Sequence, residues 1–237
     1  MKPIYEPKGR AGEYGDFAVN IYSGCPHRCY YCFAPQVLHR ERKQFHSHTE
    51  PRAGIVDAVK RQLEKDAISG KLIHLCFTCD PYPAGADTTP TREIIKAIKA
   101  AGNNVQILTK GDGRRDFDLL DGGDWYGVTY SCDDTMARTK EPGAASPSTR
   151  LLCLEMAKAA GIKTWVSFEP VIDVQAVLTC IKDRADIIDK AKIGKLNYWP
   201  SDIDWRSFGH AAEMACQEAG LDYYIKEDLR KKMEEAT

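Results

Sequence analysis

Three cysteines stand close together near the start of the chain. They belong to the run Gly24-Cys25-Pro26-His27-Arg28-Cys29-Tyr30-Tyr31-Cys32, in which the thiols have C-x3-C-x2-C spacing. Three thiolates on one short loop are suited to hold three irons of a cubane iron–sulfur cluster and to leave the fourth iron without a protein ligand. Because an iron with an open position is reactive, this loop is the first candidate for chemistry.

Structural zinc is the competing interpretation of these thiols. A structural zinc ion takes four ligands, usually from two C-x2-C pairs, and Cys76 and Cys79 offer a second such pair. The spacing of the first run differs from that of a zinc knuckle, and alternation along a strand would turn Cys76 and Cys79 to opposite faces. The pattern favours a cluster, and a zinc-binding module without catalysis stays as an alternative.

The segments that must position these thiols alternate along the chain. Short β-branched or aromatic runs predict strands, and apolar residues at helical spacing predict helices. The expected strands are 17–22, 72–78, 105–109, 126–131, 164–168, 187–193 and 223–225, and the expected helices are 53–68, 91–101, 146–160, 174–181 and 205–219. This order predicts an α/β fold with a parallel sheet, doubly wound or curled into a full or partial barrel, whose strands carry the chemistry at their carboxyl ends.

Length and composition narrow the class of protein. The 237 residues fit one α/β domain spanning 1–237, and 33 Lys and Arg against 34 Asp and Glu give no net basic field for nucleic acid or an anionic membrane. Contact with such a partner must therefore come from a local patch. No signal peptide and no apolar stretch of about 18 residues is present, so we expect a cytoplasmic protein without a membrane partner. Nine cysteines, an odd number, are then best interpreted as reduced thiols.

The cysteine run resembles the motif of the radical S-adenosylmethionine (SAM) superfamily, C-x3-C-x-aromatic-C on the loop after the first strand, with Tyr31 at the aromatic position. Other segments are similar to the spore photoproduct lyase-like branch, including its small bacterial and phage-encoded members. These segments are 75–83 (LCFTCDPYP), 107–111 (ILTKG), 128–133 (VTYSCD), 192–197 (KIGKLN) and 223–228 (YYIKED). The resemblance implies an incomplete (βα)6 TIM-like parallel barrel with the cluster at its C-terminal mouth.

The resemblance also implies the chemistry and the cofactors. The cofactors would be a [4Fe-4S] cluster on Cys25, Cys29 and Cys32 and S-adenosyl-L-methionine, and the partner would be a one-electron reductant of flavodoxin or ferredoxin type. Reductive cleavage of SAM would give a 5′-deoxyadenosyl radical that abstracts hydrogen from the substrate. The protein would orient the reactants and exclude water and stray hydrogen donors.

Polar residues at the expected strand ends are the candidates for cosubstrate binding. The resemblance places Thr78 and Asp80 near the methionine ammonium and carboxylate, and a carboxylate suits an ammonium through charge-assisted hydrogen bonding. It places Lys110 near the cosubstrate carboxylate and Ser131 near the ribose. Glu169, which precedes a proline after an apolar run, is expected in the site as well. An ordinary turn, surface or capping role is the alternative for each residue except Glu169.

Four further residues are candidates on the substrate side. Arg138 and Arg150 flank the segment EPGAASPS, and the planar fork of arginine suits a carboxylate or phosphate, although ordinary surface arginines would also fit. Photoproduct lyases use a cysteine near the second strand as a hydrogen donor. We therefore expect Cys76 or Cys79 to donate hydrogen to the substrate radical if either faces the barrel interior, and the alternative is that both are small buried residues.

The expected substrate is a nucleic acid base or nucleotide, because the photoproduct lyase-like branch includes radical chemistry at thymine in DNA. Thymine-type repair, hypermodification and rearrangement are the versions of this expectation. The Tyr198-Trp199 pair could stack a base or could simply pack. A peptide or a small metabolite is the alternative substrate, which the balanced charge of the chain favours.

Overall fold

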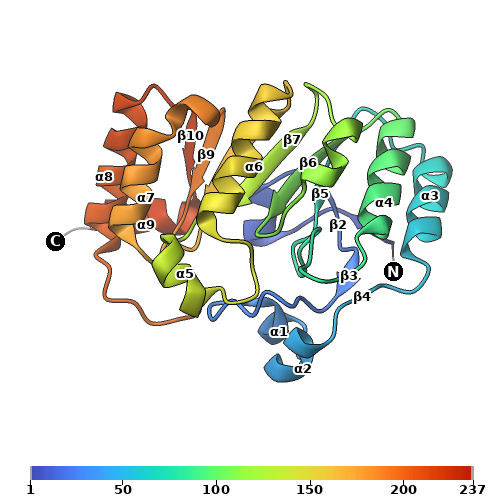
Figure 1. The fold of residues 1–237 in the computed structure, drawn as a ribbon, viewed down its shortest axis with the longest axis horizontal. Coiled ribbons are helices and arrows are strands. Elements are labelled where there is room, and N and C mark those ends of the chain that lie inside the picture. Colours follow the sequence, from blue (N-terminus) through green and yellow to red (C-terminus); the bar gives the residue numbers. More distant parts are fainter. Residues whose placement is uncertain (1, 236–237) are drawn as a thin grey trace.

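A single curved sheet forms the centre of the computed structural model, which describes residues 2–235. Its strand order is β1-β2-β5-β6-β7-β8-β9-β10 (Figure 1). The first pair is antiparallel and every other neighbouring pair is parallel. The strands are β1 (Ile4–Tyr5), β2 (Phe17–Val19), β5 (Leu72–Leu75), β6 (Asn104–Thr109), β7 (Trp125–Thr129), β8 (Lys163–Phe168), β9 (Lys190–Ile193) and β10 (Tyr223–Ile225).

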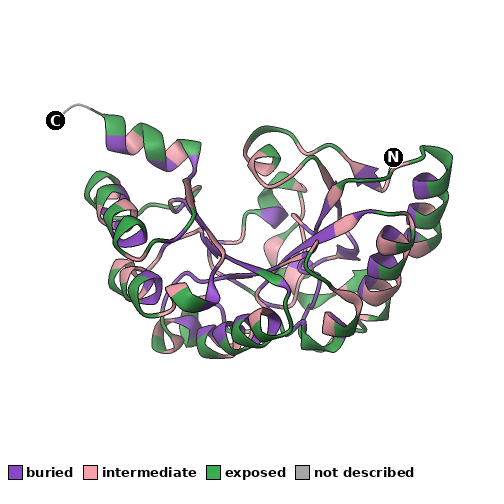
Figure 2. Cartoon of the chain, turned by 90° about the horizontal axis from the view of Figure 1, so that it is seen from above, coloured by how far each residue is buried: buried purple, intermediate pink, exposed green. Residues whose placement is uncertain are grey.

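Helices cover the outer side of the sheet. Figure 2 shows the strands curving into an arc, with helices along its convex side and an open gap between its two ends. The helices are α3 (Ile55–Lys65), α4 (Thr89–Ala100), α5 (Asp134–Lys140), α6 (Pro147–Ala159), α7 (Val174–Asp183), α8 (Trp205–Glu218) and α9 (Glu227–Glu234), with short 3-10 turns η1 (Gly9–Glu13), η2 (Arg114–Leu119) and η3 (Ala185–Ile187). The predicted incomplete TIM-like parallel barrel is confirmed, with β2 to β9 as its six parallel strands and β10 extending the arc.

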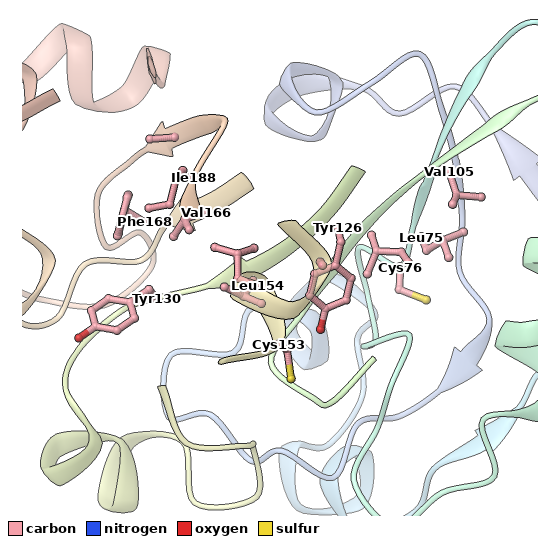
Figure 3. Close-up of a cluster of buried hydrophobic side chains, with 14 of the residues drawn as sticks. Leu75, Cys76, Val105, Tyr126, Tyr130, Cys153, Leu154, Val166, Phe168 and Ile188 are labelled. Carbon is pink, nitrogen blue, oxygen red and sulfur yellow. The ribbon is translucent and has the colours of Figure 1, made fainter. Parts of the chain in front are cut away.

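The main core lies between the sheet and these helices. In α3, Ile55, Val59 and Leu63 recur every four residues and are buried, which explains why this segment forms an amphipathic helix. Figure 3 shows Leu75 and Val105 from the strands with Leu154 of α6 in the same buried cluster. The thiols of Cys153, Cys180 and Cys216 are all buried. No helix within residues 2–235 is both long and apolar enough to cross a membrane.

Three segments differ from the sequence-based expectation. The expected strand 72–78 ends at Leu75, because Cys76 takes a left-handed backbone conformation (φ 68°) that a strand does not continue through. The strand expected at 17–22 divides into β2 and β3 (Tyr22–Ser23), which pairs with β4 (Glu50–Pro51). The strand expected at 187–193 begins only at Lys190. The connection after the cysteine run also contains two unpredicted helices, α1 (Ala34–Val37) and α2 (Arg42–Ser47).

Close packing on the inner face of the arc depends on Gly127 of β7. The indole N–H of Trp165 donates to the carbonyl of Ile107 (2.9 Å) across this glycine. A Cβ at Gly127 would lie 2.1 Å from Trp165 Nε1. We expect Gly127→Ala to lower the free energy of unfolding by about 1–3 kcal/mol, measured by urea denaturation. In the control Gly122→Ala the new Cβ would meet only the Gly161 carbonyl oxygen at 3.6 Å, and an equal loss in both variants would contradict the account.

Candidate functional site

A cavity of about 490 Å³ lies at the carboxyl ends of the strands, and this volume suits a small-molecule ligand. The three thiols of the C-x3-C-x2-C run line it. Other lining residues come from the ends of β6, β7 and β8, from the N-terminal segment and from residues 195–198. They include Thr78, Asp80, Thr109, Lys110, Thr129, Glu169, Tyr14 and Lys226. The fold thus brings together side chains from distant parts of the sequence around one cavity.

The cysteine loop is held by α2, which lies on the same side of the sheet as β3 and β4 (Figure 1). The guanidinium of Arg42 donates to the carbonyls of Cys29, Tyr30 (2.6 Å) and Cys32 (2.9 Å). At the start of the loop, Gly24 has φ 88°, and a Cβ there would lie 2.0 Å from a backbone oxygen of the segment that follows α2. A side chain at position 24 would therefore displace the loop.

The three thiols of this loop are largely shielded from solvent. Burial raises the pKa of Cys29 to about 12 and raises the pKa values of Cys25 and Cys32 as well. Within the described residues, no three His, Cys, Asp or Glu side chains converge on one point, as a single metal ion requires. A cubane would place each of the three thiolates on a different iron.

A buried ionic chain lies behind the cysteine loop. The Tyr31 hydroxyl donates to Glu141, and Glu141 is paired with Arg150, whose Nη1 and Nε donate to the carbonyls of Thr129 (3.0 Å) and Ala145 (2.8 Å). Glu141 and Arg150 side chains have no exposed surface. The expectation that Arg150 binds substrate is therefore wrong, because its guanidinium is fully engaged in the interior.

Two other predicted residues lie apart from the cavity. Ser131 is fully buried, contacts the Tyr31 hydroxyl (3.3 Å) and does not line the cavity. Direct contact between Ser131 and a ribose does not fit this position. Arg138 is exposed on α5 and does not line the cavity either, so its proposed contact with substrate would lie outside the enclosed volume.

Asp80 ties two strand ends together at the wall of the cavity. Its carboxylate accepts hydrogen bonds from Thr109 Oγ1 (2.5 Å), the Lys110 backbone N–H (2.8 Å) and the Tyr82 backbone N–H (2.9 Å), and His27 Nδ1 lies 3.5 Å away. A carboxylate has about four acceptor positions, and His27 faces the fourth one with a protonated Nδ1, because its Nε2 accepts the Ala84 N–H (3.3 Å). The contact expected between Asp80 and the methionine ammonium stays a proposal. The hydrogen bonds show that Asp80 also positions Thr109 and the backbone of Lys110.

Glu169 belongs to a second polar group, on the opposite wall. Its Oε2 accepts from Tyr14 Oη (2.9 Å) and pairs with Lys226, and Asn197 Nδ2 lies 3.3 Å from Oε1. A Cβ at Gly194 would lie 2.9 Å from the Glu169 carboxyl carbon, so only glycine leaves room for this side chain. Glu169 is therefore a cavity residue, as the sequence suggests, although it is already paired.

Lys110 and Thr78 complete the predicted cosubstrate set. The Lys110 ammonium lies 5.4 Å from the centre of the Tyr31 ring, and its charge lowers the pKa values of Cys29 and Cys32 against the larger effect of burial. The Thr78 hydroxyl oxygen accepts a hydrogen bond from Arg52 (3.4 Å). Both side chains line the cavity.

Cys76 and Cys79 both line the cavity, contrary to the strand-based argument that they face opposite sides. The left-handed turn at Cys76 folds the chain back so that the two sulfurs interact. Cys79 Sγ accepts the backbone N–H of Tyr22 (3.4 Å). Burial raises the pKa of Cys76, whereas hydrogen bonds from Cys76, Tyr22 and Ile21 overcome burial and lower the pKa of Cys79.

Comparison with known families decides the class of protein. Residues 19–173 match the family model of the radical SAM superfamily. The chain belongs to the radical SAM superfamily. An uncharacterized protein of Mycobacterium tuberculosis is 28% identical over 170 residues, which cover 66% of this chain and 49% of that protein. An uncharacterized protein of Acidianus two-tailed virus is 29% identical over 206 residues, covering 80% and 67%. This radical SAM chain thus spans about half the length of its mycobacterial relative.

Solved structures share the radical SAM fold. Spore photoproduct lyase complexed with dinucleoside spore photoproduct superposes with a TM-score of 0.70 at 13% identity, covering 93% of this chain and 79% of the lyase. Streptococcus suis SuiB bound to S-adenosylmethionine gives a TM-score of 0.69 at 12% identity, covering 93% and 52%. The family match makes this chain a radical SAM enzyme, and its family implies a [4Fe-4S] cluster, SAM and an electron donor.

One cavity residue and two residues that support the cysteine loop were given no role from the sequence. Tyr14, Arg42 and Glu141 act through contacts with segments 12 to 155 residues away, and no local pattern signals such pairs. Arg42 lies in the basic segment 39–48, and its guanidinium holds the loop carbonyls. Lys226 lies in the YYIKED segment, one of the segments that resemble the photoproduct lyase-like branch. That resemblance was the signal that could have identified Lys226 as a site residue.

Proposed function

We propose that this radical SAM enzyme carries a [4Fe-4S] cluster on Cys25, Cys29 and Cys32 and abstracts hydrogen from a nucleic acid base or nucleotide. The observation that carries the proposal is the position of the three motif thiols on the wall of one cavity at the strand ends. With SAM bound, the cluster supplies the one-electron chemistry that generates the 5′-deoxyadenosyl radical. Thymine-type repair, hypermodification and rearrangement all begin with such an abstraction.

The side chains around the cavity would orient SAM and exclude water. Lys110 offers a cation for the SAM carboxylate, and the Asp80 carboxylate lines the same cavity and has the charge that suits the ammonium. Tyr31 would fix the loop from behind through Glu141. Because these groups are held before any ligand binds, little reorganisation is needed when the cofactors enter.

The nucleic acid substrate is supported by two comparisons. The spore photoproduct lyase structure contains a dinucleoside photoproduct, and one relative of this chain is viral. The cavity also carries cations beyond those paired with acids, namely Lys8, Lys110 and Lys195. A peptide is the competing substrate, since SuiB has been solved with a precursor peptide.

Deuterium transfer tests the choice of substrate directly. Reconstituted protein, SAM and a one-electron reductant would be incubated without oxygen with deuterated thymidine, a deuterated thymine oligonucleotide or a deuterated peptide mixture. We expect deuterium in 5′-deoxyadenosine only with the thymine-containing compounds, because the radical removes hydrogen from its own substrate. Transfer from the peptides alone would contradict the proposal.

We further propose that Cys76 or Cys79 returns hydrogen to the substrate radical. We expect one of the two variants, Cys79→Ser or Cys76→Ser, to keep SAM cleavage within about twofold of wild type and to form a different product. The reason is that a hydroxyl is a far poorer hydrogen atom donor than a thiol. Products would be separated by liquid chromatography and mass spectrometry. Cys180→Ser, in a buried thiol of α7, is the control. Normal product from both variants would show that neither thiol is the donor.

A further inference from the structure

Four aromatic side chains lie at or beside the mouth of the cavity and form what we call the aromatic rim: Tyr30, Phe33, Tyr198 and Trp199. Phe33 and Tyr198 line the cavity, and Phe33, Tyr198 and Trp199 are 39%, 56% and 40% exposed. The large exposed hydrophobic side chains of residues 2–235 are these three with Val37, Leu152, Met156 and Met214. Since Val37 also lines the cavity and Trp199 follows Tyr198 in the chain, four of these seven side chains lie at or next to this opening.

The rings of the rim lie in two neighbouring pairs. The rings of Phe33 and Tyr198 are 6.4 Å apart between centroids and only 24° from parallel, and those of Tyr30 and Trp199 are 5.9 Å apart. Tyr198 has φ 69°, a conformation that costs free energy for a bulky residue. The chain therefore adopts an unfavourable backbone geometry at the residue whose ring is the most exposed of the four.

Cations accompany these rings. The guanidinium of Arg10 lies 4.8 Å from the centre of the Tyr198 ring, and the Lys140 ammonium lies 4.6 Å from that of Tyr30. Lys8 and Lys195 line the cavity beside them, while Asp228 pairs with Arg10 at 2.6 Å. The whole chain has a formal net charge of −1, so this concentration of positive charge is local.

We propose that the aromatic rim binds an unpaired segment of nucleic acid and presents one base to the cavity. Interleaved aromatic and cationic side chains are the recognised platform for single strands, with bases on the rings and phosphates on the cations. In a duplex the base faces are covered by stacking, so only an unpaired base offers a face to Tyr198 and Phe33. The inference rests on the proposed function and specifies an unpaired strand as the form recognised.

Binding of a fluorescein-labelled single-stranded oligothymidylate to the cluster-loaded protein, followed by fluorescence anisotropy, tests the rim. Two substitutions at one position separate ring from backbone: Tyr198→Phe keeps the ring, and Tyr198→Gly keeps the positive φ without it. We expect Tyr198→Gly to weaken binding about tenfold and Tyr198→Phe to stay within about twofold of wild type. Met214→Ala, exposed on α8, should bind as wild type does. Wild-type affinity should fall as salt is raised.

Several results would overturn the rim proposal. These include equal oligonucleotide affinity of wild type and Tyr198→Gly, equal affinity of wild type for duplex and single strand, and binding of a labelled peptide in place of the oligonucleotide. A parallel loss of SAM affinity in Tyr198→Gly would also overturn it, because the ring would then belong to the cosubstrate site. Deuterium transfer from thymidine without oligonucleotide binding would refute the rim alone. Oligonucleotide binding without transfer from any thymine compound would refute the proposed substrate and leave the rim supported.

Discussion

Cys29→Ala is expected to remove the iron–sulfur cluster and reduce SAM cleavage to background. Wild-type protein reconstituted without oxygen should hold about four irons. Three of them would each be bound by one thiolate of the loop, and the fourth would have no protein ligand. Cys29 is 6% exposed, and its backbone carbonyl is held by Arg42. The other two thiols of the loop already serve as ligands, so the loop offers no substitute for Cys29. Iron and sulfide analysis, visible absorption and 5′-deoxyadenosine formation measure the effect.

The control for this loss is Cys216→Ala. Cys216 is likewise buried, but it lies on α8 in the core and away from the cavity. We expect this variant to keep its iron and its SAM cleavage, because it deletes a buried thiol of the same size at a site without chemistry. A Cys29→Ala protein with a full iron content would remove Cys29 from the ligand set.

Arg150→Met is expected to be the most destabilising single substitution among those considered. It would leave the Glu141 carboxylate buried without its cation, and breaking a buried pair in this way costs about 3–5 kcal/mol. The carbonyls of Thr129 and Ala145 would lose their donors as well. Because Glu141 also holds Tyr31, the cysteine loop should load less cluster. Urea denaturation of the purified variant measures the loss.

The pH dependence of stability provides a second signature of this pair. Burial alone would raise the pKa of Glu141, but the charges of Arg150 and Lys110 lower it below its ordinary value of 4.5. A carboxyl group with a lowered folded-state pKa stabilises the fold above the unfolded-state pKa. That contribution is lost as the pH falls through the folded-state pKa. In Arg150→Met, burial dominates and the pKa of Glu141 should rise, so the penalty should shrink as the pH is lowered from 7 toward 5.

The double variant Glu141→Gln/Arg150→Met separates charge from packing. Since it removes both charges, it should recover a large part of the stability that Arg150→Met loses. Equal instability of the single and double variants at pH 7 would contradict the claim that the unpaired carboxylate causes the loss.

The parts of the fold that follow local patterns could be predicted from the sequence. The β–α alternation predicts the parallel sheet and the edge where its strand ends meet, whereas the cluster on Cys25, Cys29 and Cys32 stays a prediction from their spacing. The α3 residues Ile55, Val59 and Leu63 have the helical period that their burial requires. These features depend on residues within a few positions of one another.

The parts that were missed depend on backbone conformation or on distant contacts. The left-handed turn at Cys76 ends β5 early, and nothing in the residue type signals it, so alternation gave the wrong faces for Cys76 and Cys79. Arg150 was interpreted as a substrate-binding residue, with an ordinary surface arginine as the alternative, because its partner Glu141 becomes visible only once α6 packs on β7. Tyr14 enters the cavity from the N-terminal segment, to which the sequence assigned no element.

Electron paramagnetic resonance of the reduced protein, with and without SAM, tests the central claim most directly. Protein reconstituted with iron and sulfide without oxygen and then reduced with dithionite should show the signal of a reduced [4Fe-4S] cluster. Adding SAM should change that signal, since only an iron without a protein ligand can bind the methionine moiety. A signal that SAM leaves unchanged would contradict the account. So would freshly isolated, oxygen-free protein that holds stoichiometric zinc and binds no iron.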